Sequence, residues 1–518
     1  MNSSSNNSNV LSNAGNSGSL VSSVCSAMFS ARSAQARWAT TPLRERLVRI
    51  RELRRLIAEH AHVLAEASAF ARQRPTLESL TSEVLPLAEA CRFLEQESTA
   101  LLAPRRLGFR GLPLWLSGVR SEIRRDPFGV VLIIGPGNYP LLLPGVQLIQ
   151  ALVAGNAVLL KPGVGGSLAA RTLVEIIHRA GFDSDLVTLL PESADAARAA
   201  IEAGPDKVIF TGSAATGEKI LAQLAPQLIP ATMELSGCDA VIVRADADLD
   251  LTVKALTFGL TLNNGGTCMA PKRVLVHRSI ATELEGRLAR SFPRSSRGDE
   301  VFYSSQKDRS FLTSAATHQL RPLLEEAIGQ GAHFITGGFM NDGSIQTPVI
   351  LAGLAPSARL LREDIFAPVL ALVTVVDDAE AAARANDCPY ALGTSIFSRD
   401  EAVARSIATS LNAGVITIND VIIPTADARL PFGGRKRSGF GVTRGAEGLL
   451  QLTVIKVVTV SRGKFRPAFD PPAAKDEAMF QAYLELTHGH GLANRARALI
   501  TLFISLSGRK KSPRKRTP

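Results

Sequence analysis

The chain has few cysteines, and their spacing fits neither a disulfide framework nor a metal site. The five are scattered along the sequence: Cys25, Cys91, Cys238, Cys268 and Cys388. An odd number of isolated cysteines is typical of a protein in a reducing compartment. The eight histidines form no HExxH motif and have no CxxC partner. We therefore predict a cytoplasmic protein without a metal site.

Signals for export and for crossing a bilayer are also missing. No lysine or arginine precedes Arg32, which argues against a secretory signal and against a mitochondrial presequence. No apolar run reaches the roughly 18 residues that span a bilayer. The shorter apolar segment 498–506 directly precedes a basic tail. Two interpretations of the C-terminal extension stay open: a helix packed on the protein's own surface, and peripheral contact with a membrane.

The net charge of +11 is concentrated at one end of the chain, because 509–516 contains six lysines and arginines. A basic tail of this kind is most often solvated, so we predict no specific nucleic-acid partner. A noncatalytic scaffold or nucleic-acid-associated protein remains a competing hypothesis. It predicts that deletion of residues 507–518 abolishes function, whereas Cys268→Ala does not.

Alternating strand-like and helix-like segments predict an α/β protein. Residues 1–30 are rich in Ser, Asn and Gly and predict disorder, and 31–102 predict amphipathic helices. Apolar runs about 25 residues apart predict a doubly wound parallel sheet; these strands are 130–135, 157–161, 186–190, 207–211 and 232–235. A second α/β body is predicted from strands at 240–243, 273–276, 348–351, 369–373 and 414–418. The segment 430–441 is too glycine-rich for a regular element.

One cysteine lies in an unusual context, Thr261-Leu-Asn-Asn-Gly-Gly-Thr-Cys-Met-Ala-Pro271. Free cysteine is among the most buried residue types. Taken alone, the motif therefore leaves two interpretations of Cys268 open, a buried structural thiol and a nucleophile.

Motifs in a common order resemble the aldehyde dehydrogenase superfamily over about residues 31–465. They are Pro127-Phe-Gly-Val with Gly135-Pro-Gly-Asn-Tyr-Pro140, Gly155-Asn-Ala-Val-Leu-Leu-Lys-Pro162, Phe210-Thr-Gly-Ser213 with Gly217, Met233-Glu-Leu-Ser-Gly237, Gly265-Gly-Thr-Cys268, Glu363-Asp-Ile-Phe-Ala-Pro-Val369 and Pro431-Phe-Gly-Gly434. The sequences Asn-Tyr-Pro and Thr-Cys-x-Ala-Pro resemble those of the fatty- and aromatic-aldehyde branch of the family. The resemblance implies NAD(P)-dependent oxidation of an aldehyde to a carboxylic acid.

The catalytic residues that the resemblance implies are Cys268, Asn138 and Glu234. Cys268 would add to the aldehyde as a thiolate and Asn138 would stabilise the oxyanion of the thiohemiacetal. After hydride transfer, Glu234 would activate the water that hydrolyses the thioester. Other interpretations are a turn residue for Asn138 and an edge carboxylate for Glu234. A family member that acylates coenzyme A or oxidises a semialdehyde within a pathway remains the alternative function.

The resemblance also implies NAD or NADP as cofactor, although GxGxxG is absent. The cofactor-binding candidates are Lys161, Gly212, Ser213, Gly217, Leu235, Asp364 and Phe366. Ser213 would begin a helix that binds the pyrophosphate, Lys161 would reach the adenine ribose, and Phe366 would lie beside the nicotinamide or in the core. Val164 stands where the family often has a glutamate that grips the ribose 2′-hydroxyl. That change opens the site to NADP.

Other departures from the family pattern blur the substrate preference. Gly137 replaces a tryptophan, so either the aldehyde channel is wider or another segment fills the gap. Gly266 replaces a glutamine, and we expect the loop that carries Cys268 to be more mobile than is typical. Ser236 and Cys238 stand in the usual Gly-Gly-Lys motif, and Cys238 is interpreted as structural.

The resemblance assigns a role to each predicted region. Residues 31–108 and 127–237 would form the cofactor-binding domain, and 238–445 the catalytic domain. Residues 109–126 and 446–465 would form a small β element for oligomerisation, giving a homodimer or homotetramer. Residues 466–518 would be a C-terminal extension with the basic tail.

Overall fold

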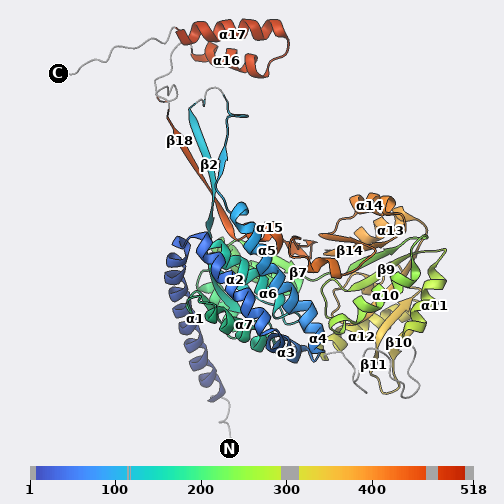
Figure 1. Ribbon diagram of the computed structural model, residues 1–518. Coiled ribbons are helices and arrows are strands. Elements are labelled where there is room, and N and C mark those ends of the chain that lie inside the picture. The colour runs from blue at the N-terminus through green and yellow to red at the C-terminus, as the bar shows by residue number, and fades with distance from the viewer. Residues whose placement is uncertain are drawn as a thin grey trace, which may run out of the picture. The chain divides into compact units, whose positions relative to one another are not determined.

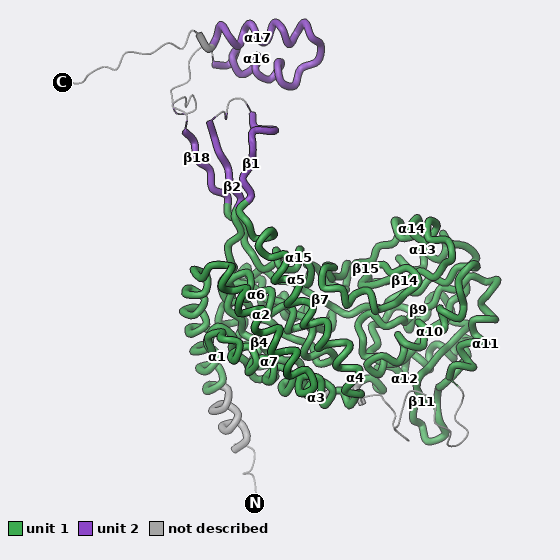
Figure 2. Tube along the Cα trace, in the orientation of Figure 1, with its two compact units in different colours: residues 1–104, 124–456 green, residues 105–123, 457–518 purple. Residues whose placement is uncertain are grey.

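The computed structural model describes residues 8–113, 116, 118–292, 314–462, 469 and 476–507. The chain divides into two compact units (Figure 2). Unit 1 comprises residues 1–104 and 124–456, and unit 2 comprises residues 105–123 and 457–518. Unit 1 contains two sheets with helices packed around each of them (Figure 1). This arrangement confirms the predicted α/β fold class.

A six-stranded sheet with the order β17-β7-β6-β3-β4-β5 forms the first half of unit 1. Strands β3 to β7 are parallel, and β17 pairs antiparallel with β7. The order reverses between β3 and β6, so the sheet is doubly wound, as predicted, and its ligand edge is the carboxyl end of these strands. The strands are β3 Val130–Ile134, β4 Ala157–Lys161, β5 Val187–Leu189, β6 Lys207–Gly212, β7 Ala231–Leu235 and β17 Gly439–Phe440.

Helices cover this sheet and share one hydrophobic core with it. They are α1 Ser8–Thr40, α2 Leu43–Glu59, α3 Ala61–Arg72, α4 Thr76–Ser79, η1 Leu80–Val84, α5 Leu85–Leu101, α6 Leu142–Ala154, α7 Ser167–Arg179, α8 Ala194–Glu202, α9 Ala214–Leu224 and η3 Ala225–Gln227. Helix α6 packs on β3 and β4 and against α2 and α5. The amphipathic helices predicted over 31–102 are therefore present.

Helix α1 corrects the prediction of disorder over residues 1–30, which is wrong from residue 8 onward. The helix packs on β3, β4, β5 and α8. Val24, Met28 and Ala31 are buried against the sheet core, at three- and four-residue spacing. The low-complexity composition hid this apolar face, because Ser, Asn and Gly make up most of residues 1–30. Residues 1–7 lie outside the described residues.

A seven-stranded sheet with the order β10-β11-β12-β9-β8-β14-β15 forms the second half of unit 1. All its pairs are parallel except β10 with β11. The strands are β8 Asp239–Val243, β9 Pro271–His277, β10 His333–Phe339, β11 Ile345–Ala352, β12 Val369–Val375, β14 Gly393–Phe397 and β15 Val415–Ile418. The sequence did not predict β10 and β14, because glycine, serine and threonine interrupt their apolar patterns.

Helices and short elements complete the second half. They are α10 Leu249–Thr261, η4 Leu262–Gly265, α11 Ala281–Ser291, α12 Ser314–Gly329, η5 Arg359–Leu361, α13 Asp378–Asn386, β13 Tyr390–Ala391, α14 Glu401–Ser410, η6 Ile423–Ala426, β16 Arg435–Lys436 and α15 Gly445–Leu450. The prediction that 430–441 forms no regular element is wrong, because this segment contains β16 and β17. Strand β17 pairs with β7 at the edge of the first sheet, and its Gly439 lies opposite Glu234.

Unit 2 contains a three-stranded sheet with the order β1-β2-β18 and the helix pair α16 and α17. The elements are β1 Arg105–Leu107, β2 Val119–Pro127, β18 Thr453–Ser461, α16 Asp476–His488 and α17 Leu492–Ser507. Strands β2 and β18 run on into unit 1. The apolar segment 498–506 belongs to α17, and the basic tail that follows lies outside the described residues. Over the described ranges, no helix has the length and hydrophobicity needed to cross a bilayer.

Candidate active site

The loop before Cys268 has a backbone conformation that few residues adopt. Asn263, Asn264 and Gly265 have φ angles of 51°, 53° and 72°, three left-handed residues in succession. Asparagine and glycine are the residues that tolerate this region. A Cβ on Gly265 would lie 2.3 Å from the nitrogen of Pro368. The Asn-Asn-Gly motif therefore turns the chain tightly against the Ala367–Pro368 segment.

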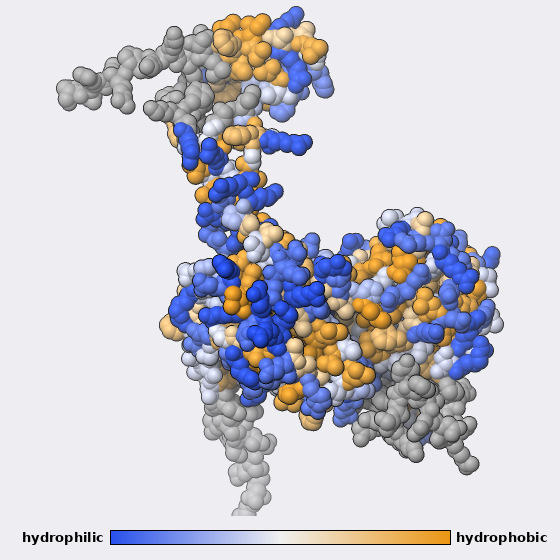
Figure 3. Space-filling model, in the orientation of Figure 1, coloured by the Kyte–Doolittle hydropathy of each residue, from blue (hydrophilic) through white to orange (hydrophobic). Residues whose placement is uncertain are grey.

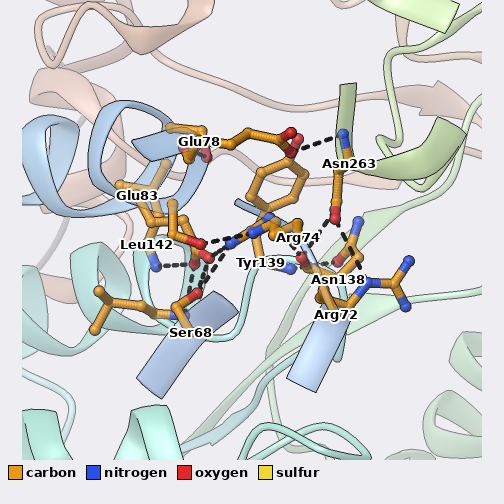
Figure 4. Close-up of polar contacts among 12 residues, drawn as sticks. Ser68, Arg72, Arg74, Glu78, Glu83, Asn138, Tyr139, Leu142 and Asn263 are labelled. Carbon is orange, nitrogen blue, oxygen red and sulfur yellow. Dashed lines mark hydrogen bonds and ion pairs between the residues drawn. The ribbon is translucent and has the colours of Figure 1, made fainter. Parts of the chain in front are cut away.

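Asn138 contacts this loop from the turn after β3 (Figure 4). Its Nδ2 donates to the Gly266 carbonyl at 2.9 Å, and its Oδ1 accepts from the Tyr139 N–H at 3.0 Å. Asn263 Nδ2 donates to the carbonyl of Asn138 at 2.9 Å. A side-chain amide has two N–H donors. The orientation of the Asn138 amide is thus fixed, and one N–H has no hydrogen-bond partner within the described part of the chain.

The packing around position 266 explains why a glycine stands there, which the sequence did not reveal. A Cβ on Gly266 would lie 2.5 Å from Nη2 of Arg72 and 3.0 Å from the Asn263 carbonyl. Arg72 Nε donates to Asn263 Oδ1 at 3.5 Å, and the Gly266 N–H donates to the Asn263 carbonyl at 2.9 Å. The guanidinium occupies the space beside the glycine. These contacts hold the loop and count against the expectation that Gly266 makes it unusually mobile.

Glu234 lies at the carboxyl end of β7 and is 4% exposed. Its Oε2 accepts from Gln147 Nε2 and from Thr443 Oγ1, both at 3.1 Å. Its Oε1 is buried and has no hydrogen-bond partner among the described residues. Burial raises the pKa of the Glu234 carboxyl, while the charge of Arg444 opposes the rise. One oxygen of a held carboxylate is therefore free to exchange a proton.

Cys268 is partly exposed and packs against the apolar cluster of Met269, Leu392 and Phe432. Burial of the thiol raises its pKa to about 12, and the charges of Glu234 and Asp239 add to the rise. Arg444 and the Met269 N–H act in the opposite direction. The electrostatic coupling to Glu234 and the Asn138–Gly266 bond show that the structure brings these three predicted residues to one place.

A buried ion pair supports the Asn138 turn. The side chains of Arg74 and Glu83 are 1% and 0% exposed and are paired with each other. Glu83 Oε2 accepts from the N–H groups of Leu141 and Leu142, at 2.8 and 2.9 Å, at the start of α6. Arg74 Nη1 donates to the Asn138 carbonyl at 3.4 Å. Sequence reasoning missed this pair, although a lone carboxylate in the run Glu83-Val-Leu-Pro-Leu87 is a signal of the same kind as Glu234.

The cofactor candidates gather at the carboxyl ends of β4, β6 and β7. Lys161 ends β4, Leu235 ends β7, and Ser213 caps α9 by accepting from the Thr216 N–H at 3.3 Å. A Cβ on Gly217 would lie 2.9 Å from Leu235 Cδ2, so the glycine lets α9 approach β7 closely. A helix N-terminus at the carboxyl edge of the sheet suits a pyrophosphate. The residues present fit a dinucleotide.

Two further candidates lie on the segment before β12. Asp364 accepts from Ser236 Oγ and from the Tyr390 hydroxyl, the latter at 3.1 Å. Phe366 is 37% exposed, which disfavours the core interpretation of this ring. Gly212, the remaining candidate, would place a Cβ 2.5 Å from the Phe210 ring. All the predicted cofactor residues therefore lie in unit 1, at strand ends, at the start of α9 or on this segment.

Local packing explains two departures from the family pattern, Gly137 and Cys238. A Cβ on Gly137 would lie 2.6 Å from the carbonyl oxygen of Val164. The main chain of the 163–166 loop fills the gap, so the interpretation of a wider channel at Gly137 is wrong. Cys238 is buried and donates to the Leu361 carbonyl with an Sγ–O distance of 3.6 Å.

A small cavity of about 10 Å³, room for a single water molecule, lies in the first half of unit 1. Helices α5 and α6, η6 and the start of α15 form its wall. The lining residues are Pro86, Ala90, Phe93, Leu94, Leu142, Val146, Gln150, Ala426, Ala428, Arg444 and Gly445. Small and aliphatic side chains dominate this surface.

The fold and the site define an oxidoreductase that combines a cysteine, a buried carboxylate and a dinucleotide site on a doubly wound sheet. The sequence model of the aldehyde dehydrogenase family matches residues 14–458. The chain belongs to the aldehyde dehydrogenase family. It is therefore an enzyme that oxidises aldehydes with NAD or NADP.

Individual relatives agree with this assignment. The chain is 31% identical over 461 residues to a 4,4'-diapolycopene aldehyde oxidase of Methylomonas sp, covering 88% of this chain and 86% of the relative. It is 30% identical over 463 residues to a Mycolicibacterium smegmatis protein provisionally named succinate-semialdehyde dehydrogenase [NADP(+)], covering 88% of each. The crystal structure of an NAD-dependent aldehyde dehydrogenase from Sinorhizobium meliloti is similar with a TM-score of 0.78 and 27% identity, covering 87% of this chain and 89% of that chain.

Proposed function

We propose that this protein oxidises an apolar aldehyde to the free carboxylic acid, with Cys268 as nucleophile, Asn138 as oxyanion donor and Glu234 as general base. The observation that carries this proposal is the buried, unpartnered Oε1 of Glu234 beside a thiol. A buried carboxylate without a task would be costly. Its presence favours hydrolysis of the thioester over transfer to coenzyme A.

The raised pKa of Cys268 requires that its proton leave before the thiol attacks. The thiol proton is released to solvent, which leaves Oε1 of Glu234 unprotonated for the later hydrolysis. The thiolate then forms a bond to the aldehyde carbon, and the carbonyl oxygen becomes an oxyanion. The second N–H of Asn138 and the main-chain N–H of Cys268 supply the donors for that charge.

A bound NAD(P) would supply the acceptor for the hydride of the aldehyde carbon. Lys161, Ser213, Gly217 and Asp364 are the residues that would hold it. The thioester that remains on Cys268 is attacked by a water whose proton goes to Glu234 Oε1. The carbon–sulfur bond breaks, the acid leaves, and the thiol is reprotonated. Gln147 and Thr443 hold the other oxygen of Glu234 during this transfer.

The name of the Methylomonas relative, 4,4'-diapolycopene aldehyde oxidase, supports an apolar aldehyde as the substrate. Oxidation of a semialdehyde remains the second candidate, because Arg444 offers a positive charge and one relative carries that name.

A panel of aldehydes tests the proposal. Straight-chain aldehydes of increasing length, aromatic aldehydes and succinate semialdehyde are assayed with NAD and with NADP, and products are identified by mass spectrometry with coenzyme A present. We expect free acids, and higher activity with the apolar aldehydes than with succinate semialdehyde. Cys268→Ser should abolish turnover, and Cys238→Ser, a matched change of another cysteine, should retain it. Turnover of no aldehyde, or an acyl-coenzyme A product, would contradict the proposal.

We further propose that the sheet β1-β2-β18 forms the interface of a homodimer or homotetramer in the cytoplasm. Leu107, Val457 and Val460 are large apolar residues exposed on this sheet. Analytical ultracentrifugation of the wild type and of Val457→Glu tests the interface. Dissociation of the variant into monomers is expected, and a monomeric wild type would contradict the proposal.

The C-terminal helix pair is the candidate membrane contact. Leu499, Ile500, Phe503 and Ile504 are exposed on α17, whereas Ala498 and Ser505 are buried. Hydrophobic residues gather on the surface of the helix pair in Figure 3. Apolar residues followed by a basic segment suit an anionic lipid surface. Co-sedimentation with phosphatidylserine vesicles should exceed that with phosphatidylcholine vesicles. Phe503→Ser should reduce it, and sedimentation with neither vesicle would exclude the contact.

A further inference from the structure

A carboxylate and a lysine lie at neighbouring strand ends on the cofactor edge of the first sheet. Strands β4 and β5 are parallel, with Leu160 opposite Leu189. Lys161 is the last residue of β4, and Glu192 follows β5 by three residues. In a doubly wound sheet the dinucleotide lies across the carboxyl ends, with a carboxylate at the ribose of the adenosine half when the cofactor is NAD.

Glu192 is placed for that role by contacts with the loop after β4. Its Oε2 accepts from the Gly165 N–H at 3.1 Å and from Ser167 Oγ at 2.7 Å. Its Oε1 has no hydrogen-bond partner in the described part of the chain, and the residue is half-buried. The charge of Glu192 also counters the lowering of the Lys161 pKa by burial, so the two charged groups are near each other.

The loop itself supplies no carboxylate. Val164, at its tip, is 82% exposed. Gly163 is packed so tightly that a Cβ would lie 2.2 Å from the carbonyl carbon of Pro136. The main chain therefore runs between the turn after β3 on one side and Glu192 on the other. The acidic group of this region comes from the strand next to the one that carries Lys161.

We infer that Glu192 accepts hydrogen bonds from the hydroxyls of the adenosine ribose and thereby selects NAD over NADP. A carboxylate accepts strongly from two neighbouring hydroxyls, whereas it repels a 2′-phosphate. Lys161 is only 7% exposed, so the half-exposed carboxylate sets the preference. The inference rests on the proposed function only through the use of a dinucleotide. It reverses the expectation that the loss of a glutamate at Val164 opens the site to NADP.

Equilibrium binding of the reduced cofactors tests the inference without any aldehyde. Dissociation constants of NADH and NADPH are measured by cofactor fluorescence for the wild type, Glu192→Gln and Ser167→Ala. Glutamine keeps an acceptor for Gly165 and Ser167 but removes the charge. Ser167→Ala removes a hydrogen bond to the same carboxylate oxygen and leaves the charge. This matched variant separates anchoring of the loop from recognition of the ribose.

We expect the wild type to bind NADH more tightly than NADPH by about tenfold or more, and Glu192→Gln to lower this ratio by about tenfold. Ser167→Ala should leave the ratio within about twofold. A wild-type preference for NADPH overturns the inference, and so does a Glu192→Gln ratio equal to that of the wild type. Selective NADH binding without oxidation of any aldehyde contradicts the proposed function alone. Binding of neither dinucleotide contradicts both.

Discussion

Replacing Glu83 by glutamine should destabilise unit 1 by about 3–5 kcal/mol, because it breaks a fully buried ion pair. The partner, Arg74, is 1% exposed and is left without a countercharge. One oxygen of Glu83 faces Arg74 and Ser68, and the other accepts two N–H groups at the start of α6. A glutamine has a single acceptor oxygen, so its NH2 group meets donors on one side or the other.

The matched control is Glu401→Gln. Glu401 pairs with Arg405 on the surface of α14, where the two side chains are 67% and 72% exposed. An exposed pair contributes about 0–1 kcal/mol. The two substitutions make the same chemical change, so the difference between them isolates the effect of burial.

Urea unfolding followed by far-ultraviolet circular dichroism and by tryptophan fluorescence measures the difference. Trp38 is a suitable reporter, because it is buried in the same core and donates to the Leu152 carbonyl at 2.8 Å. Activity should fall as well, since Arg74 supports the Asn138 carbonyl. A Glu83→Gln protein as stable as the Glu401→Gln protein would refute the reasoning.

Two further predictions concern the thiol and the strand beside Glu234. Because burial raises the pKa of Cys268 to about 12, its thiol is protonated at neutral pH. The rate of its alkylation by iodoacetamide should rise about tenfold per pH unit from pH 7 to 9. Peptide mapping measures this rate, and a plateau below pH 9 would contradict the raised pKa. Gly439→Ala should lower the free energy of unfolding by at least about 2 kcal/mol and remove most of the activity. The reason is that φ of Gly439 is +100° and a Cβ would lie 1.9 Å from the Met233 carbonyl oxygen. Gly329→Ala, with open space around its Cβ, is the control, and equal stability of the two variants would exclude the steric argument.

The sequence predicted the elements whose pattern is local. The buried strands β3, β4 and β6 are continuous apolar runs, and the helices of 31–102 have apolar residues at helical spacing. Helix α1 was missed because the helical spacing of Val24, Met28 and Ala31 lies within a stretch rich in Ser, Asn and Gly. Strand β14 was missed because Gly393, Thr394 and Ser395 are buried without being apolar.

The residues of the candidate site also fall into two groups, those that a local motif predicts and those that it does not. Cys268, Asn138 and Glu234 follow from motifs, because each motif has its own turn or strand end. Arg72 and Arg74 do not, since their roles depend on contacts with residues more than sixty positions away. The reason for Gly266 is likewise the guanidinium of Arg72, which no local pattern contains. Side chains that act on distant segments require the tertiary structure.

The most direct test of the account is a rapid-mixing experiment on Glu234→Gln with an apolar aldehyde. The account predicts a stoichiometric burst of reduced cofactor, followed by turnover about 100- to 10,000-fold slower than that of the wild type. Intact-protein mass spectrometry should find the acyl group on Cys268 during the slow phase. Because burial raises the pKa of Glu234, wild-type hydrolysis of the thioester should quicken with rising pH, and the variant should lose this dependence. Hydrolysis at the wild-type rate, or no acyl group on Cys268, would contradict the account.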